Sequence, residues 1–277
     1  SEWGCFGMTP LDRNVIKDYL DENTTEVKGS ITTAKQEILA KVKESAESSS
    51  SSGGVQTFTE DGTFTVPAGV TKILVTACGG GAGGGGAIAS DEAGAGGNGG
   101  SCIIREPYTV IPNSKINIVI GLGGAAGTSS SSSNSNPKSG GSGGTTVIGS
   151  LVSLPGGVAQ VYATTPNTED RNVGAGIGGK GARTSSNSSQ CRYAGDGENG
   201  VRGCGGTGDG YGARDGYTSG GGGGGSFGNG GNGAYYFNRK THYATNAGYG
   251  GGGGGATNDT SSNTASAGGN GIVIIEW

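Results

Sequence analysis

Between Leu20 and Glu47, apolar positions recur with the spacing of an α-helix. They follow one another at intervals of four, three, four and four residues, at Val27, Ile31, Ala34, Ile38 and Val42. This narrow stripe predicts a coiled-coil helix over residues 20–47, because Glu and Lys occupy much of the remaining surface. A helix of this length is marginally stable alone. We therefore expect self-association, and isoleucine at alternate seam positions favours a homotrimer.

Beyond residue 54, short β-like segments alternate with glycine. Phe58 and Phe64 flank Asp61-Gly62, a pattern typical of a hairpin. Further strands are predicted at 70–75, 102–110, 115–120, 145–154 (a strand pair) and 272–275. The strands at 70–75 and 115–120 lead directly into glycine tracts.

Glycine is concentrated in six tracts, at 79–87, 94–100, 121–127, 174–182, 219–234 and 248–256. One such tract would be read as a linker. Six tracts with strands between them favour extended threefold helices, whose N–H and C=O groups point sideways and must pair with neighbouring backbones. We therefore predict a mostly β fold with packed polyglycine II helices after the coiled coil. Disordered low-complexity sequence is the open alternative.

The amino-terminal residues 1–19 carry large apolar side chains, which normally need a surface to dock on. We interpret this segment as an anchor to a larger assembly, through Trp3, Phe6, Met8 and Leu11. Packing on its own trimer axis is the alternative. Residues 48–54 form a Ser/Gly linker by composition, and residues 55–277 form a glycine-rich domain.

The composition excludes several classes of protein. With 65 Gly in 277 residues, 31% hydrophobic and 6% aromatic residues, the chain cannot build a large side-chain core. Collagen is excluded because a strict Gly-X-Y period is absent. A net charge of −4 argues against a nucleic-acid partner. The longest apolar run, 272–275, has four residues and the amino end lacks a secretory pattern, so we expect neither membrane insertion nor export by that route.

The chain has five cysteines, at Cys5, Cys78, Cys102, Cys191 and Cys204. An odd number without CxxC spacing argues against a disulfide framework and against a zinc site. Free buried thiols are the favoured expectation. The alternatives are Cys191 paired with Cys204 across a loop and Cys78 paired with Cys102 across neighbouring strands.

The sequence contains only weak matches to motifs for phosphate binding, catalysis or metal binding. Gly174, Gly176, Gly179 and Lys180 approach the spacing of a phosphate loop, but Gly181 stands where magnesium needs a hydroxyl and no helical pattern follows. His242 is the only histidine, and no nucleophile motif is present. We expect no enzyme activity, no cofactor and no metal site. A cation held by Asp196 with Glu198, or by Asp209 with Asp215, is the open alternative.

Four elements in a fixed order carry a family resemblance: FTVPAGVTKILVTACGGGAGGGG, INIVIGLGG, TTVIG followed by LPGG, and GGNGIVIIEW. Over about residues 55–277 they resemble the glycine-rich domain of bacteriophage tail-fibre and related virion proteins. The plan is also similar to adhesins of T-even-like phages, in which polyglycine helices stack and the loops between them contact the host receptor. The resemblance implies a location in the virion after assembly in the host cytoplasm, with residues 1–19 as the virion anchor.

Aromatic and basic residues interrupt the glycine and are the candidate receptor contacts, because rigid rings give contact area at low entropic cost. They are Arg192, Tyr193, Tyr211, Arg214, Tyr217, Tyr235, Tyr236, Phe237, Arg239, His242 and Tyr243. The expected partner is a host-surface glycan or protein. Coverage of the bundle flanks or of trimer seams is the alternative role.

Together these features predict a structural phage fibre, mounted on the tail or on the head, that projects a glycine-rich domain for host attachment. A decorative capsid fibre without a receptor role and an ice-binding polyglycine bundle are the alternatives. A disordered matrix protein is a further rival, and the ordered strand units weigh against it.

Overall fold

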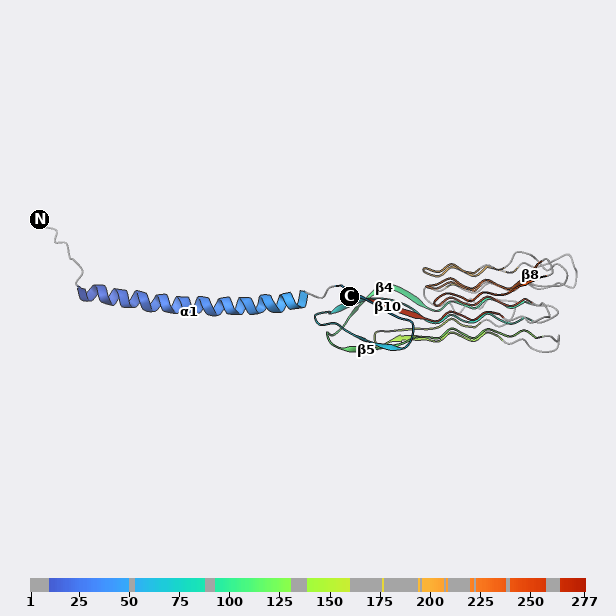
Figure 1. Ribbon diagram of the computed structural model, residues 1–277, viewed down its shortest axis with the longest axis horizontal. Helices are drawn as coiled ribbons and strands as arrows, with labels where there is room; N and C mark the ends of the chain where they lie inside the picture. The colour runs from blue at the N-terminus through green and yellow to red at the C-terminus, as the bar shows by residue number, and fades with distance from the viewer. Residues whose placement is uncertain are drawn as a thin grey trace. The chain divides into compact units, whose positions relative to one another are not determined.

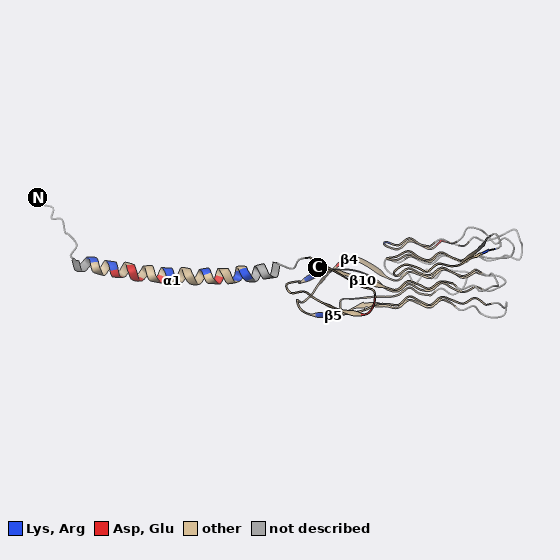
Figure 2. Cartoon of the chain, in the orientation of Figure 1, with Lys and Arg blue, Asp and Glu red and all other residues tan. Residues whose placement is uncertain are grey.

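The computed structural model describes residues 10–49, 53–87, 93–130, 139–159, 176, 194, 196–206, 208, 220–221, 223–237, 240–257 and 265–277 (Figure 1). The chain divides into two compact units, Ser1–Ser52 and Gly53–Trp277. Figure 2 shows Lys, Arg, Asp and Glu distributed along the helix of the first unit.

The first unit contains one long helix, α1 (Pro10–Ser49). It begins ten residues before the expected start at Leu20, because Pro10 supplies a backbone angle favoured at the first helical position. Of the expected anchor residues, Leu11 therefore lies in the helix, whereas Trp3, Phe6 and Met8 lie outside the described residues. Within the described part of the chain, no helix is both long and apolar enough to cross a membrane.

Among its described residues, the second unit contains two four-stranded antiparallel sheets and a separate hairpin. The first sheet has the order β1 (Val55–Phe58), β10 (Ile272–Glu276), β3 (Lys72–Cys78) and β4 (Cys102–Thr109). The second has the order β2 (Gly62–Thr65), β5 (Lys115–Val119), β6 (Thr146–Ile148) and β7 (Val152–Leu154). The hairpin pairs β8 (Tyr235–Phe237) with β9 (Lys240–His242).

The hairpin expected at Asp61-Gly62 is wrong. β1 pairs with β10 and β2 pairs with β5, so this corner carries the chain from one sheet to the other. The Asp61 carboxylate accepts the N–H of Ile120 at 2.8 Å, which ties the corner to the second sheet. Separating the two strands lets Phe58 and Phe64, 8% and 0% exposed, enter the same core from opposite sheets.

The core lies between the two sheets. Alternation along β5 turns Ile116 and Ile118 inward, and the other strands contribute residues in the same way. The largest fully buried side chains are Phe64, Ile73, Ile118, Ile148 and Ile275. Each such burial is worth about 1.5–3 kcal/mol. Trp277 closes the edge of this core against Phe64, with ring centroids 5.4 Å apart.

Six strands of the two sheets are continuous with glycine-rich extended segments. β3, β5 and β7 lead into segments 79–87, 121–130 and 155–159, and segments 93–101, 139–145 and 265–271 lead into β4, β6 and β10. Figure 1 shows these segments leaving the sheets side by side. The two sheets therefore set the starting position and direction of each glycine-rich segment.

Segment 79–87, called the central segment below, donates to three neighbours with a period of three residues. Gly79, Ala82 and Gly85 donate to 93–101, Gly80 and Gly83 to 139–145, and Gly81 and Gly84 to 265–271, over N···O distances of 2.8–3.0 Å. Its carbonyl groups accept from three further segments, 121–130, 155–159 and 248–257. The central segment is thus hydrogen-bonded to six neighbours, whereas a β-strand pairs with two.

Candidate functional site

The expected receptor contacts divide into those that the structure describes and those that it does not. Tyr235, Tyr236 and Phe237 form β8, His242 ends β9 and Tyr243 follows it. Arg192, Tyr193, Tyr211, Arg214, Tyr217 and Arg239 lie outside the described residues. The described part of this cluster, which interrupts the glycine tracts, is therefore a short antiparallel hairpin.

Ring stacking across the hairpin organises its base. Tyr235 and His242 are Cα partners in the β8–β9 ladder, and their rings are stacked with centroids 4.2 Å apart and planes 5° apart. Lys240 and Tyr243 are exposed, Tyr243 to 62%. The stacked ring pair, the exposed ring of Tyr243 and the ammonium group of Lys240 together offer stacking surface and hydrogen-bond donors.

The hairpin lies at the end of the glycine segments that is remote from the two sheets (Figure 1). Ala234, immediately before β8, donates to the carbonyl of Gly255 and accepts from Gly220. At the same level, Ala87, Ala256 and Ala265 pack into a small apolar cluster. We call this end the distal end.

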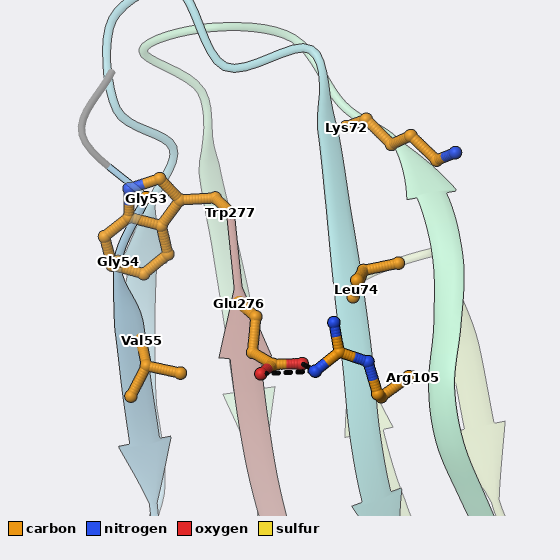
Figure 3. Close-up of a pocket in the computed structure, with 8 residues that line it drawn as sticks. All are labelled: Gly53, Gly54, Val55, Lys72, Leu74, Arg105, Glu276 and Trp277. Carbon is orange, nitrogen blue, oxygen red and sulfur yellow. Dashed lines mark hydrogen bonds and ion pairs between the residues drawn. The ribbon is translucent and has the colours of Figure 1, made fainter. Parts of the chain in front are cut away.

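A pocket of about 570 Å³ lies at the opposite end of the second unit, beside the first sheet (Figure 3). Its lining includes Val55, Lys72, Leu74, Arg105, Glu276 and Trp277. Arg105 Nη1 contacts both carboxylate oxygens of Glu276, at 2.8 and 2.7 Å. The two side chains are 59% and 30% exposed, so the ion pair is largely solvated.

Arg105 has an unusual backbone conformation, with φ at +50°. It lies at a β-bulge opposite β3, where the register shifts between Val75 and Ala77, and its N–H donates to Thr76 Oγ1 at 3.0 Å. Sequence reasoning missed this site because Arg105 and Glu276 lie 171 positions apart and neither belongs to a motif.

The described cysteines are Cys78, Cys102 and Cys204, and all three thiols are free. Cys78 and Cys102 are buried, as expected, whereas Cys204 is exposed, so the expectation of burial is wrong for it. Burial raises the pKa of Cys78 from 9.0 to about 12, and the neighbouring Cys102 adds to the shift. Burial likewise raises the pKa of Cys102 to about 11, with Arg202 opposing it.

The phosphate-loop motif does not present a free backbone donor at its one described glycine. Gly176 donates to Gly225 at 2.8 Å and accepts from Gly99 at 3.0 Å, so its backbone is used within the glycine array. Gly174, Gly179 and Lys180 lie outside the described residues. Asp196 accepts the N–H of Gly208 at 2.8 Å, the role of a turn carboxylate. In the part of the chain that the structure describes, no three His, Cys, Asp or Glu side chains could jointly hold a metal ion.

Comparison with known proteins gives one assignment. A comparison with curated proteins finds no match to this chain. The family model of the glycine-rich domain matches residues 56–277, which include both sheets, the glycine segments and the distal hairpin. The chain therefore belongs to the glycine-rich domain family, and this domain is its second structural unit.

Proposed function

We propose that the chain is a homotrimeric structural fibre protein of a bacteriophage virion, whose glycine-rich domain presents its distal end to the surface of the host cell. It has no enzymatic role and needs no cofactor. The proposal rests mainly on the hydrogen bonds that join the central segment to six neighbours. They support a rigid, ordered array of glycine segments rather than a flexible linker.

The three-residue period supports polyglycine II helices in the glycine segments. A threefold extended helix turns successive N–H groups toward three directions and makes no hydrogen bonds within itself. The donors of Gly79, Gly80 and Gly81 follow this rule, since they reach three different segments. An array of this kind satisfies its backbone groups sideways and needs few large side chains.

The exposed stripe on α1 supports the homotrimer. Val27, Ile31, Ile38 and Val42 are 57–62% exposed, and Ala34 between them is also exposed. Apolar side chains in a row along a helix are stabilised when they pack into a coiled-coil seam. Residues 1–19, with Trp3, Phe6, Met8 and Leu11, then serve as the virion anchor in this proposal.

The distal hairpin supports host contact, with a surface glycan or protein as the partner. Tyr243 and Lys240 are exposed and lie within two residues of His242, whose ring stacks on Tyr235, at the end away from the two sheets. Tyrosine is among the side chains that contribute most of the binding energy at recognition surfaces. The undescribed candidates Arg192, Tyr193, Tyr211, Arg214, Tyr217 and Arg239 remain part of the proposed contact surface.

The oligomeric state tests the fibre. Light scattering coupled to size exclusion should give a trimer for the full chain, and Ile31→Asp with Ile38→Asp should abolish it. Glu37→Gln, a change outside the seam, should remain trimeric. A monomeric wild-type chain would contradict the proposed trimer.

Adsorption to cells tests the receptor role. Fluorescently labelled full-length protein is mixed with the bacterium that the source phage infects, and is then used to compete with phage adsorption. Tyr243→Ala with Lys240→Ala should weaken binding at least tenfold. Leu122→Ala, a change at a 68% exposed residue next to the sheets, should bind normally. If the wild type neither adsorbs to cells nor competes with phage, the receptor-binding role is wrong and the alternative, a decorative capsid fibre, is favoured.

A further inference from the structure

Cys78 and Cys102 stand opposite each other at the last rung of the β3–β4 ladder. They are Cα partners in the antiparallel register. The next residue along, Gly79, donates its N–H to the carbonyl of Ser101 at 2.9 Å, while the Ser101 N–H donates to Pro155. The ladder bond therefore forms on the rung of Gly79 and Ser101, next to the cysteine pair. Because the two kinds of pair alternate, Cys78 and Cys102 form a non-hydrogen-bonded pair.

This pair type matches the geometry of a disulfide bond. Cα atoms of a non-hydrogen-bonded antiparallel pair are about 4.5 Å apart, and their side chains lie on the same face of the sheet. Disulfides span Cα separations of about 4.4–6.8 Å. The thiols can therefore be joined with no more than side-chain rotation.

The two thiols are enclosed by the surrounding chain. Each cysteine can therefore react with the other. Cys78 is 0% exposed and Cys102 is 2% exposed, and Phe227 and Ile274 pack against them. The guanidinium of Arg202 lies over the Phe227 ring, 5.0 Å from its centroid. A methyl group at Gly250 would come within 2.7 Å of Cys78 Sγ, so the space above the thiol is filled by backbone.

We infer that Cys78 and Cys102 are a latent disulfide pair, which a low-molecular-weight disulfide such as oxidised glutathione oxidises during folding or local opening. The bond covalently links β3 to β4 at the junction between the first sheet and the glycine segments. This inference rests on the strand register and does not depend on the proposed attachment role.

A disulfide bond at this junction would fix the pairing register on both sides of it. On one side of it, β3 and β4 pair with the period of two of a strand ladder. On the other, the same two backbones pair every third residue, as Ala82 with Asn98 and Gly85 with Ala95. Glycine tracts carry no side chains that would oppose a slip between neighbouring backbones. A covalent bond at this rung holds the register of both halves.

The chemistry balances as two thiol–disulfide exchanges. The thiolate of one cysteine attacks a glutathione disulfide, forms a mixed disulfide and releases one glutathione thiolate. The second cysteine attacks the protein-bound sulfur, forms the S–S bond and releases the second glutathione. Two protein thiols are oxidised, one glutathione disulfide is reduced, and the two protons end on the two glutathiones.

Peptide mapping of the wild-type full chain tests the inference. The protein is denatured, reduced, refolded with oxidised glutathione, alkylated with iodoacetamide and digested with trypsin without reduction. Cleavage after Lys72 and Arg105 yields peptide 73–105, which contains both cysteines. The expected mass is that of the unmodified peptide less two hydrogen atoms. Two alkylated cysteines, a glutathione adduct or a link to Cys5, Cys191 or Cys204 would each overturn the inference.

Thermal unfolding tests the effect of this bond. The oxidised wild type should unfold roughly 5–10 °C higher than the same protein after dithiothreitol treatment, because the bond closes a loop of about 25 residues in the unfolded chain. Cys102→Ser should show no such difference, and its peptide 73–105 should carry one alkylated thiol. An oxidised wild type with an unchanged midpoint would show that the bond does not hold the junction together.

Discussion

The hydroxyl of Thr146 donates a hydrogen bond to the backbone carbonyl of Cys78 at 2.8 Å, and so joins the second sheet to the end of the first. The same oxygen accepts the N–H of Gly121 at 3.0 Å, and the side chain is fully buried. One side chain thus satisfies two backbone groups at the point where the strands give way to glycine.

Replacing this hydroxyl should be costly. Thr146→Val keeps the shape but leaves a buried carbonyl and a buried N–H without this partner, so we expect a loss of about 2–4 kcal/mol in the free energy of unfolding. Thr146→Ser keeps the oxygen and should lose only about 1 kcal/mol for the missing methyl group. Urea titration measures both. A Thr146→Val protein as stable as the wild type would show that the hydroxyl contributes nothing.

Adding a single methyl group to the central segment should disrupt the array. A Cβ on Gly83 would overlap the carbonyl group of Ala125 in a neighbouring backbone, which cannot yield as a flexible side chain would. We expect Gly83→Ala to lower the free energy of unfolding by at least about 3 kcal/mol, or to prevent folding.

The matched control is Gly29→Ala in α1, where nothing lies within 4 Å of the added methyl group. This change should stabilise the helix by about 0.5–1 kcal/mol. Circular dichroism followed against temperature measures both variants. A soluble Gly83→Ala protein with the wild-type melting curve would contradict the close approach of these backbones.

The positive φ of Arg105 should affect how substitutions at this position change the free energy of unfolding. Glycine tolerates this conformation, whereas a β-branched residue is strained in it. We expect Arg105→Gly to remain within about 1 kcal/mol of the wild type, since the solvated ion pair with Glu276 contributes little. Arg105→Val should be less stable than Arg105→Gly by about 1–2 kcal/mol. Chemical denaturation of the two variants tests this, and a more stable Val variant would contradict it.

The buried thiols should make the reduced protein sensitive to alkali. The pKa of Cys78 is raised from 9.0 to about 12 and that of Cys102 to about 11 in the folded state. The stabilisation is fully present below the unfolded-state pKa near 9, and is lost as the pH rises toward the folded-state values, because the unfolded chain releases these protons first.

The measurement is the free energy of unfolding of the reduced protein between pH 8 and about 11. Cys78→Ala with Cys102→Ala should flatten the decline. Burial and Glu106 also raise the pKa of Tyr108, which acts in the same direction, but Tyr108 is present in both proteins and cancels in the difference. Parallel profiles for the two proteins would show that the thiols do not titrate differently on unfolding.

Local patterns predicted much of the fold. The strands at β3, β5 and β10 were found from their alternating or apolar residues, and the entry of β3 and β5 into glycine is confirmed. The hairpin at Asp61-Gly62 was wrong because a turn signal fixes where the chain bends but not which strands pair afterwards. The receptor contacts stay a prediction, since most of them lie outside the described residues.

From the residues alone it was possible to infer that the bare backbones of the glycine tracts must pair sideways. Only the tertiary structure decided which neighbour each tract meets, because a residue without a side chain carries no information about its partner. That choice is made by the sheets, whose strand order and direction place segments as distant as 79–87 and 265–271 next to each other. The same order places Cys78 opposite Cys102 and Arg105 beside Glu276.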